Sequence, residues 1–441
     1  MDKLNRKQIE KLINTSDVFC ILPFKHMLLQ PSGTATACCM SSDIIKDTDG
    51  KDLQWDNINF DKELWQNEFY QELRTNMIKG IKSNACRNCY EQERTGSKSY
   101  RQGQNKRFLN NIHGIDEILP RSELSTINTV TGNNYGHPTD WDIRFSRLCN
   151  LKCRMCDSIS SSQIYKEGKE HPQLQQFRGH AEPVHDEYNY GEKDATYVLK
   201  TLPQVDRLKV LGGEPTLDPQ VQIVLDEAIR IGRDDMYLDI TTNLTNVTDR
   251  WLESLGRFKD VQLQFSIDGT EKTNEYIRSP SQWVQVEENI RRYLNFEAAT
   301  DTNWMLSFHQ TVNIYNIFDF WKVHGWIESL REEDTFARLE AEFAYHTYVL
   351  HTPVDLDARI LPLEYRPKIL ENFNKYRPCI TQDLSTIGMQ SVIDLLENNT
   401  QPANATKLLA SCKRRTDAVD KVRGQHLKDY IPQLATVLNS G

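Results

Sequence analysis

Short apolar runs alternate with amphipathic stretches between residues 140 and 350 of this 441-residue chain. Such alternation is typical of βαβ units, whose parallel strands are buried on both faces. It predicts an α/β fold, and six strands fit a (β/α)6 partial TIM-like barrel. The candidate strands are residues 140–146, 206–212, 236–243, 261–268, 304–313 and 341–350.

The helix expected after the second strand has clear start and stop signals. Asp218 is placed to cap its amino end, and Pro219 suits the first turn because the missing N–H is not needed there. Apolar residues at helical spacing then form one stripe as far as Gly232, which favours a helix end. A second helix is expected over residues 281–296.

Length and composition divide the chain into several parts. A chain of 441 residues is long enough for two or three domains. Residues 1–110 are predicted to form a cysteine-rich domain, and residues 111–140, rich in Asn, Thr, Gly and Pro, a linker. The barrel is expected over residues 141–350 and a mainly helical cap over residues 351–441.

Two polar stretches are predicted to lie in water. Residues 158–194 contain three histidines at irregular spacing among polar residues, which favours a solvated loop over a metal site. Residues 411–430, SCKRRTDAVDKVRGQHLKDY, are predicted to present an exposed, charged helix face.

Charge and hydropathy exclude several functions. Lys and Arg number 53 against 62 Asp and Glu, and the net charge of −9 argues against nucleic acid as a partner. No run approaches the roughly 18 apolar residues of a membrane span. The charged amino terminus lacks the apolar segment of an export signal. We therefore expect a cytoplasmic protein with reduced thiols, in which grouped cysteines indicate metal binding.

Three cysteines form a CxxxCxxC pattern directly after the first candidate strand: Cys149, Cys153 and Cys156, in RLCNLKCRMCD. Thiolates are soft ligands that select zinc, copper(I) or iron–sulfur clusters. A structural zinc ion requires four ligands, and no His or Cys follows Cys156 at zinc-finger spacing. Three thiolates on a [4Fe–4S] cluster leave one iron open to a ligand from outside the protein. The position after a barrel strand favours this cluster over chance or zinc.

This motif resembles the radical SAM superfamily, whose signature is CxxxCxxC on the loop after the first strand. The resemblance implies that S-adenosylmethionine (SAM) binds the open iron through its amino and carboxylate groups. It also implies that an electron from the reduced cluster cleaves the C5′–S bond and yields a 5′-deoxyadenosyl radical. Family members often have an aromatic residue before the third cysteine. This chain has Met155 there, and its backbone can supply the adenine contact.

Later strand ends carry residues that resemble SAM-binding positions of the same family. Gly212, Gly213 and Glu214 match the GGE motif, which the resemblance associates with the SAM amino group. A glycine pair lets the backbone approach a ligand closely, although Gly-Gly alone is also a common turn. The other candidates are Asn243, Ser266 and Asp268 for the ribose or carboxylate, Arg278 for the carboxylate, and Val312 and Asn313 near adenine.

Four cysteines among the first 110 residues resemble the auxiliary-cluster motif of SPASM and twitch radical SAM enzymes. Twelve residues separate Cys20 from Gly33 and four separate Gly33 from Cys38, a spacing that favours Cys38 over Cys39. Four thiolates fit a second [4Fe–4S] or a [2Fe–2S] cluster, and a four-cysteine zinc site is the alternative. In the family this module usually follows the barrel, whereas here it precedes it. The expected ligands are Cys20, Cys38, Cys86 and Cys89.

The sequence therefore predicts a radical SAM enzyme with a twitch-like auxiliary domain, which abstracts hydrogen from a substrate. Auxiliary-cluster members often modify peptide or protein side chains, so a peptide is the expected substrate, and a sugar, nucleotide or other small metabolite is the alternative. The expected partners are SAM and a reductant such as flavodoxin or ferredoxin. The sequence identifies no catalytic residue that acts on the substrate. A non-catalytic iron–sulfur or zinc scaffold is the alternative of another class, but it has no need of SAM-type residues at successive strand ends.

Overall fold

The computed structural model describes most of the chain. None of the helices in the described part combines the length and the hydropathy that a membrane crossing needs. The expected linker lies outside the described residues over 111–137, and so do two of the three histidines of residues 158–194. The described residues are 6–55, 64–94, 98–110, 138–177, 195–300, 303–333, 344–384, 387–398 and 401–440.

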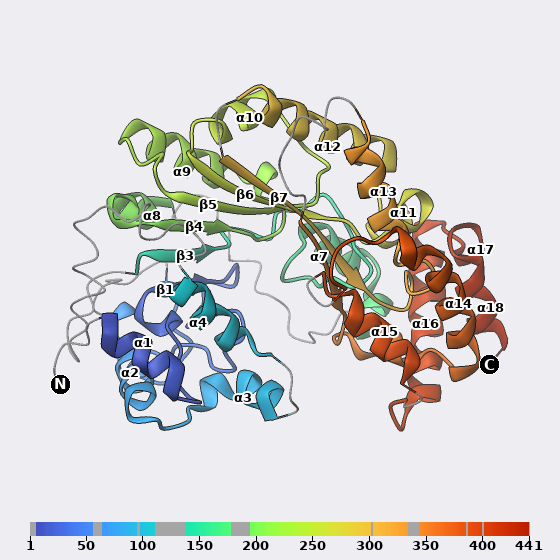
Figure 1. Ribbon diagram of the computed structural model, residues 1–441, viewed down its shortest axis with the longest axis horizontal. Helices are drawn as coiled ribbons and strands as arrows, with labels where there is room; N and C mark the ends of the chain where they lie inside the picture. The colour runs from blue at the N-terminus through green and yellow to red at the C-terminus, as the bar shows by residue number, and fades with distance from the viewer. Residues whose placement is uncertain are drawn as a thin grey trace. The chain divides into compact units, whose positions relative to one another are not determined.

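Eight strands form one sheet, which is not closed within the described part of the chain (Figure 1). The strands are β1 (His26–Leu29), β2 (Ala35–Thr36), β3 (Asp140–Ile143), β4 (Arg207–Val210), β5 (Tyr237–Thr242), β6 (Asp260–Ser266), β7 (Asn303–Val312) and β8 (Ala344–Val349). Their order is β2-β1-β3-β4-β5-β6-β7-β8, and β1 pairs antiparallel with β2 but parallel with β3. All six predicted strands are confirmed as β3 to β8. The sheet gains two more from the cysteine-rich region.

The chain divides into two compact units. The first contains Met1–Ser146, His185–Ile240 and Arg257–Val261. The expected domain bounds remain predictions, and these units cut across them because β1 pairs with β3 inside the first unit. The helices of the first unit are α1 (Arg6–Thr15), α2 (Glu68–Lys79), α3 (Arg87–Arg94), α4 (Tyr100–Asn110), α8 (Ala195–Thr201) and α9 (Pro219–Arg230).

The strands of the first unit have one apolar face and one charged face. Trp141 and Leu208 are fully buried neighbours on β3 and β4, and the residues beside them in register are Asp140 and Arg207. Arg207 donates to both carboxylate oxygens of Asp140, at 3.2 and 3.3 Å. Although burial raises it, Arg207 and His26 hold the pKa of Asp140 well below its usual range. This face therefore presents paired charges instead of a purely apolar core.

The second unit contains Arg147–Val184, Thr241–Gly256 and Gln262–Gly441. Two of its helices cover the apolar face of its strands. Phe265 of β6 lies 5.2 Å from Tyr293, and Phe308 of β7 lies 6.0 Å from Trp326, measured between ring centroids. Tyr293 belongs to α12 (Trp283–Ala298) and Trp326 to α13 (Lys322–Arg331). The other helices of this unit are α7 (Ser162–Glu170), α10 (Asp249–Leu255), α11 (Glu271–Ile277), α14 (Arg366–Tyr376), α15 (Met389–Glu397), α16 (Ala405–Arg423), α17 (Leu427–Tyr430) and α18 (Pro432–Ser440).

The opposite face of β7 and β8 is polar. Ser307 and His309 alternate with buried Phe308 along β7, and His346 lies opposite His309 in register. The two imidazole rings are 5.2 Å apart, and the Ser307 hydroxyl lies 3.0 Å from His309 Nε2. In each unit, then, the strands named above carry apolar side chains on one face and polar side chains on the other.

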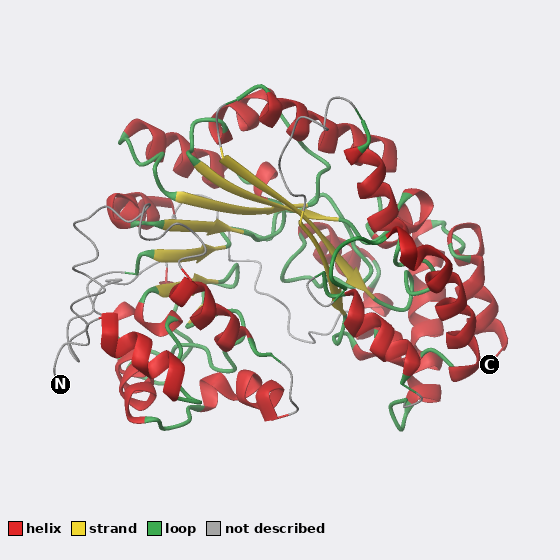
Figure 2. Cartoon of the chain, viewed as in Figure 1, coloured by secondary structure: helices red, strands yellow, loops and turns green. Residues whose placement is uncertain are grey.

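The local helix predictions are confirmed. Asp218 caps α9, because its side chain accepts a hydrogen bond from the Gln220 amide at 3.0 Å. Gly232, just after the helix, has a φ of +73°, which glycine adopts without strain. The second predicted helix is α12. Figure 2 shows the helical carboxyl-terminal region that composition predicted.

Both predictions of solvated stretches are wrong in part. Residues 162–170 form α7, which begins at a serine cap, so the first half of the polar stretch is not a loop. On α16, Arg415, Asp420 and Arg423 are buried in ion pairs and do not form an exposed face. A charge on a helix is compatible with water or with a buried partner, and the local pattern does not distinguish the two.

Candidate functional site

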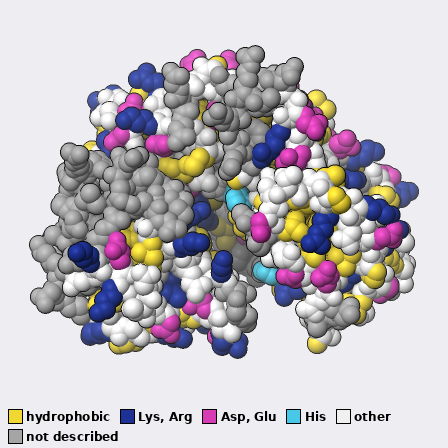
Figure 3. Space-filling view, viewed as in Figure 1, with side chains coloured by type: hydrophobic (Ala, Val, Ile, Leu, Met, Phe, Trp, Pro, Cys, Tyr) yellow, Lys and Arg dark blue, Asp and Glu magenta, His cyan; other side chains and the backbone are white. Residues whose placement is uncertain are grey.

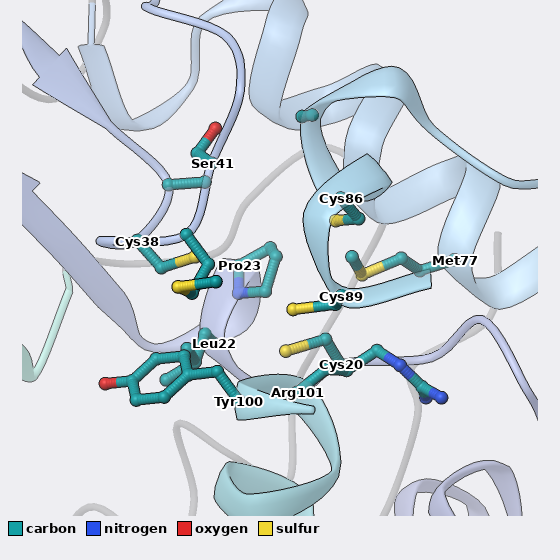
Figure 4. Close-up of a pocket in the computed structure, with 13 residues that line it drawn as sticks. Cys20, Leu22, Pro23, Cys38, Ser41, Met77, Cys86, Cys89, Tyr100 and Arg101 are labelled. Carbon is teal, nitrogen blue, oxygen red and sulfur yellow. The ribbon is translucent and has the colours of Figure 1, made fainter. Parts of the chain in front are cut away.

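Four cysteines of the first unit line one pocket (Figure 4). Each comes from a different turn or element. Cys20 precedes a 3-10 turn, Cys38 follows β2, Cys86 ends a second 3-10 turn, and Cys89 lies on α3. The structure thus brings together all four cysteines that the sequence predicted as auxiliary-cluster ligands.

A glycine turn explains how two of these cysteines meet. Gly33 has a φ of +80° and its amide donates to the Gln30 carbonyl at 3.0 Å, which closes the turn between β1 and β2. A left-handed φ is accessible to glycine without a Cβ clash. Because β2 runs back along β1, the chain returns to the end of β1 from which Cys20 leads in, and Cys38 reaches the pocket there.

Burial in the pocket disfavours the charged form of the thiols, whereas nearby backbone amides and a guanidinium favour it. Burial raises the pKa of the Cys86 thiol to about 11 and also raises that of Cys89. Backbone amides and the guanidinium of Arg101 at the start of α4 lower the pKa of Cys89. Arg101 is held by Glu93 at 3.0 and 2.7 Å. A dry pocket with a nearby cation and amides fits thiolates that are charged because a metal binds them.

The pocket distinguishes Cys38 from its neighbour Cys39. Cys38 lines the pocket, whereas Cys39 is exposed and does not line it. The interactions of Cys39 are instead with Asp142, Lys209 and Tyr100. The structure therefore places Cys38, the residue favoured by the glycine spacing, among the candidate ligands.

Four thiols around one pocket are compatible with an iron–sulfur cluster that has four cysteine ligands. Within the described residues, no three Cys, His, Asp or Glu side chains converge on one point where a metal ion would bind. In an iron–sulfur cluster with four cysteine ligands the thiolates are shared among several irons, so they need not converge. Apolar side chains supply most of the remaining pocket lining, including Leu22, Pro23 and Met77.

The three-cysteine loop lies in the second unit, immediately after β3 in the sequence. Burial, followed by the charges of Cys153, Asp157 and Cys149, raises the pKa of the Cys156 thiol, so the three thiols are near neighbours. Two donors point at Cys149: the Leu151 amide lies 3.4 Å from its Sγ, and Asn243 Nδ2 lies 3.8 Å from it. Hydrogen bonds to cluster sulfurs are one of the means by which a protein sets the reduction potential.

The GGE motif lies in the first unit, after β4. Gly212 has a φ of +131°, and a Cβ on this residue would lie 2.9 Å from the Ser146 carbonyl oxygen. The Gly213 amide donates to the same oxygen at 3.1 Å. Glu214 is buried and its carboxylate accepts from the Thr216 hydroxyl at 2.9 Å. The glycines thus allow the turn to press against the segment that leads into the cysteine loop.

The candidates of the second unit have defined surroundings. Asp268 is fully buried, pairs with Arg278 at 2.6 Å and accepts from the Thr311 amide at 2.8 Å. Asn243 also contacts the cysteine loop itself, because its Nδ2 donates to Asn150 Oδ1 at 3.1 Å. Their roles toward SAM remain predictions. The other candidates are Ser266 at the end of β6, Val312 buried at the end of β7, Asn313 buried just beyond it, and Met155, which is half-buried within the loop.

Sequence analysis missed the residues that support these cysteines. Arg101 was not singled out, since an isolated arginine on a polar helix carries no signal. Arg154 and Lys152 lie between the cysteines, and their position in the motif could have drawn attention to them. Their partners lie far along the chain, and only the tertiary structure reveals them.

An α/β sheet with a three-cysteine loop after a strand, and four more thiols around a pocket, defines an iron–sulfur protein. Residues 143–306 match the family model of the Radical SAM superfamily, and residues 20–90 match that of the SPASM iron–sulfur cluster-binding domain. The chain therefore carries a radical SAM domain, preceded in the sequence by a SPASM domain. The radical SAM domain implies a [4Fe–4S] cluster with SAM, and the SPASM domain implies an auxiliary iron–sulfur cluster.

Solved structures give distant likenesses, and no curated protein sequence matches the chain. Native anSMEcpe with bound AdoMet is 15% identical over 53% of this chain and 58% of its own, with a TM-score of 0.35. Streptococcus suis SuiB bound to S-adenosylmethionine is 12% identical over 76% of this chain and 65% of its own, with a TM-score of 0.29. This chain therefore spans less than two thirds of the length of either. These values assign no substrate.

Proposed function

We propose that the protein is an enzyme that cleaves SAM reductively and abstracts hydrogen from a peptide or protein side chain. The observation that carries the proposal is the CxxxCxxC loop within residues that match the radical SAM superfamily. When bound, the [4Fe–4S] cluster and SAM supply a 5′-deoxyadenosyl radical. The residues of the chain bind, orient and exclude water from these groups.

The cysteine loop holds the cluster in this proposal. Cys149, Cys153 and Cys156 are the three protein ligands, and the fourth iron is left to SAM. The Leu151 amide and Asn243, which donate to Cys149 Sγ, stabilise its negative charge. Reducing equivalents come from a small electron carrier such as flavodoxin or ferredoxin.

The strand ends orient SAM. The turn at Gly212 and Gly213 exposes backbone to the amino group of SAM, and the Glu214 carboxylate accepts a hydrogen bond from it. Arg278 pairs with the SAM carboxylate while Asp268 holds the guanidinium in place at 2.6 Å.

Ser266 bonds to the ribose, the Met155 backbone contacts adenine, and Val312 with Asn313 packs near the adenine ring. These four roles follow the family resemblance and the positions of the residues at strand ends and in the loop. An arginine and a carboxylate held at 2.6 Å, by contrast, are already oriented before any ligand binds.

A polar substrate is compatible with the polar face of β7 and β8, which carries Ser307, His309 and His346. Such a face suits the amides and charged groups of a polypeptide better than a lipid chain. The auxiliary cluster, with four thiolates and no open iron, would transfer electrons to or from the substrate and not bind it directly.

The test uses anaerobically reconstituted, reduced protein. Wild type is expected to convert SAM to 5′-deoxyadenosine and methionine, and Cys153→Ala is expected to yield neither. Intact clusters with no cleavage under any reductant would favour the scaffold class. For the substrate, the test peptide is one encoded beside the gene and carries deuterated side chains. Deuterium in 5′-deoxyadenosine supports a peptide substrate, whereas label from a sugar or nucleotide instead would refute it.

A further inference from the structure

We propose that the carboxyl end of α16 is a positioning device for the loop that carries Cys149, Cys153 and Cys156. Asp420 binds Arg154 directly, and Arg423 acts on Lys152 through Glu167. Lys152 and Arg154 lie between the cysteines in the sequence. The inference deepens the proposed function, because it rests on these three cysteines as cluster ligands. Every contact involved lies within the second unit.

The first contact holds the residue between the second and third cysteines. Arg154 is 2% exposed, and its Nη2 donates to Asp420 Oδ1 at 2.5 Å and to Gln425 Oε1 at 2.9 Å. Its Nε donates to the Tyr276 carbonyl at 2.9 Å, and the guanidinium lies 3.5 Å above the Tyr276 ring. A side chain with these four contacts has little rotational freedom, and it transmits that restraint to the backbone of the loop.

The second contact holds the residue between the first and second cysteines. Lys152 Nζ lies 3.1 Å from Glu167 Oε1, and Glu167 belongs to α7. Arg423 binds the same carboxylate with two parallel hydrogen bonds of 2.9 Å each. Glu167 is 4% exposed, so this bridge is desolvated. Forked arginine–carboxylate pairs fix direction as well as distance.

The end of α16 is itself fixed independently of the loop. Asp420 also accepts from the Tyr276 hydroxyl and from the Leu427 amide, both at 2.8 Å. Further back along α16, Arg415 binds Asp355 with two hydrogen bonds of 2.9 Å. The helix is therefore a rigid frame against which the loop is held, in line with the need to preorganise metal ligands.

The chemistry of these residues points to a role beyond packing. Buried ion pairs seldom stabilise a fold more than apolar side chains of the same size would. Moreover, Arg154 Nη1 and Arg423 Nη1 are buried and have no hydrogen-bond acceptor among the described residues. An anionic group bound by the loop would supply what these donors lack. Although burial raises the pKa of the Cys153 thiol, Arg423 lowers it, and a cation near the thiolates would favour the more reduced, more negative state of a cluster.

A double variant separates positioning from folding. Arg154→Met and Asp420→Leu each leave one buried charge without its partner. Each single variant is therefore expected to lose stability and also to lose the cluster held by Cys149, Cys153 and Cys156. Combined, they leave no orphan charge, so the double variant is expected to regain part of the lost stability, although the Tyr276 hydroxyl and the Leu427 amide still lack the acceptor that Asp420 provided. The cluster held by Cys149, Cys153 and Cys156 is nevertheless expected to change. Because a cation and an anion are removed together, the change arises from positioning, and we expect the reduction potential of this cluster to shift by about 59 mV, which corresponds to a tenfold change in relative affinity for the two oxidation states.

The readouts are iron and sulfide content, the electron paramagnetic resonance spectrum of the reduced cluster and its midpoint potential. The matched control is Asp355→Leu combined with Arg415→Met, which removes the same type of pair from the same helix without touching the loop. This control is expected to keep the wild-type potential.

A wild-type spectrum and potential in the Arg154–Asp420 double variant would overturn the proposal. Arg154→Lys, which keeps the charge and loses the fork, provides a milder variant for the same measurement, and an unchanged potential there would also count against it. Failure of the proposed function is distinguishable, because wild type itself would then carry no SAM-binding cluster and Cys153→Ala would change nothing.

Discussion

Replacing Cys38 and Cys39 one at a time tests whether the pocket of the first unit holds the auxiliary cluster. Cys38 lines the pocket and Cys39 does not, although the two are adjacent in the sequence. Wild type with two [4Fe–4S] clusters is expected to contain about eight irons per chain. Cys38→Ala leaves three thiolates for four irons, so about one to four irons are lost, while Cys39→Ala loses none.

The assay is iron and acid-labile sulfide per chain after anaerobic reconstitution, together with SAM cleavage to 5′-deoxyadenosine. SAM cleavage is expected to persist in both variants, because the cluster that binds SAM is held by Cys149, Cys153 and Cys156 and not by the cysteines of the pocket. Loss of iron from Cys39→Ala with full iron in Cys38→Ala would refute the assignment drawn from the pocket. Zinc in wild type at one ion per chain would refute the second cluster itself.

Two further predictions concern a glycine and a buried ion pair. Gly212→Ala should weaken SAM binding measured by calorimetry. A backbone strained at φ +131° and a contact of 2.9 Å between the new Cβ and the Ser146 carbonyl oxygen cost about 1–3 kcal/mol. The control is Gly232→Ala, which has open space around it and should leave SAM binding unchanged. Asp140→Asn should lower stability to urea at pH 7 by about 1.5–3 kcal/mol, since Arg207 loses a charged hydrogen-bond partner but keeps Asp239. Because the folded pKa of Asp140 is lowered, the stabilisation is present above the unfolded pKa of about 4 and is lost as pH falls through the folded value. The difference between wild type and variant should therefore shrink in acid, and a constant difference would contradict the argument.

On the face seen in Figure 3, basic and acidic side chains are interspersed over the described residues. This agrees with the net charge of −9. A broad phosphate-binding surface requires clustered Lys and Arg.

Local patterns predicted the elements whose signals are local. Asp218 caps α9 where the sequence places a cap, and β3 to β8 form where apolar runs occur. The pairing of β1 with β3 was not predictable in this way. These strands are separated by more than a hundred residues. The sequence of neither segment indicates with which distant strand it forms hydrogen bonds.

The same limit applies to the site. Spacing alone identified Cys149, Cys153 and Cys156, because metal ligands on one loop must be close in sequence. The partners of Arg154 and Lys152 come from α16 and α7. The sequence around a charged residue does not show whether that residue is exposed to water or buried in an ion pair.

The sequence by itself determined the soft-ligand chemistry of this protein, the loop that offers three thiolates and the strand ends where SAM-type residues lie. These features depend on residue type and short spacing, which the chain carries directly. The tertiary structure decided that four distant cysteines share a pocket, that Cys38 and not Cys39 faces it, and that the end of α16 holds the cysteine loop. Those outcomes depend on which segments meet when the chain folds, and burial and pairing exist only once they have met.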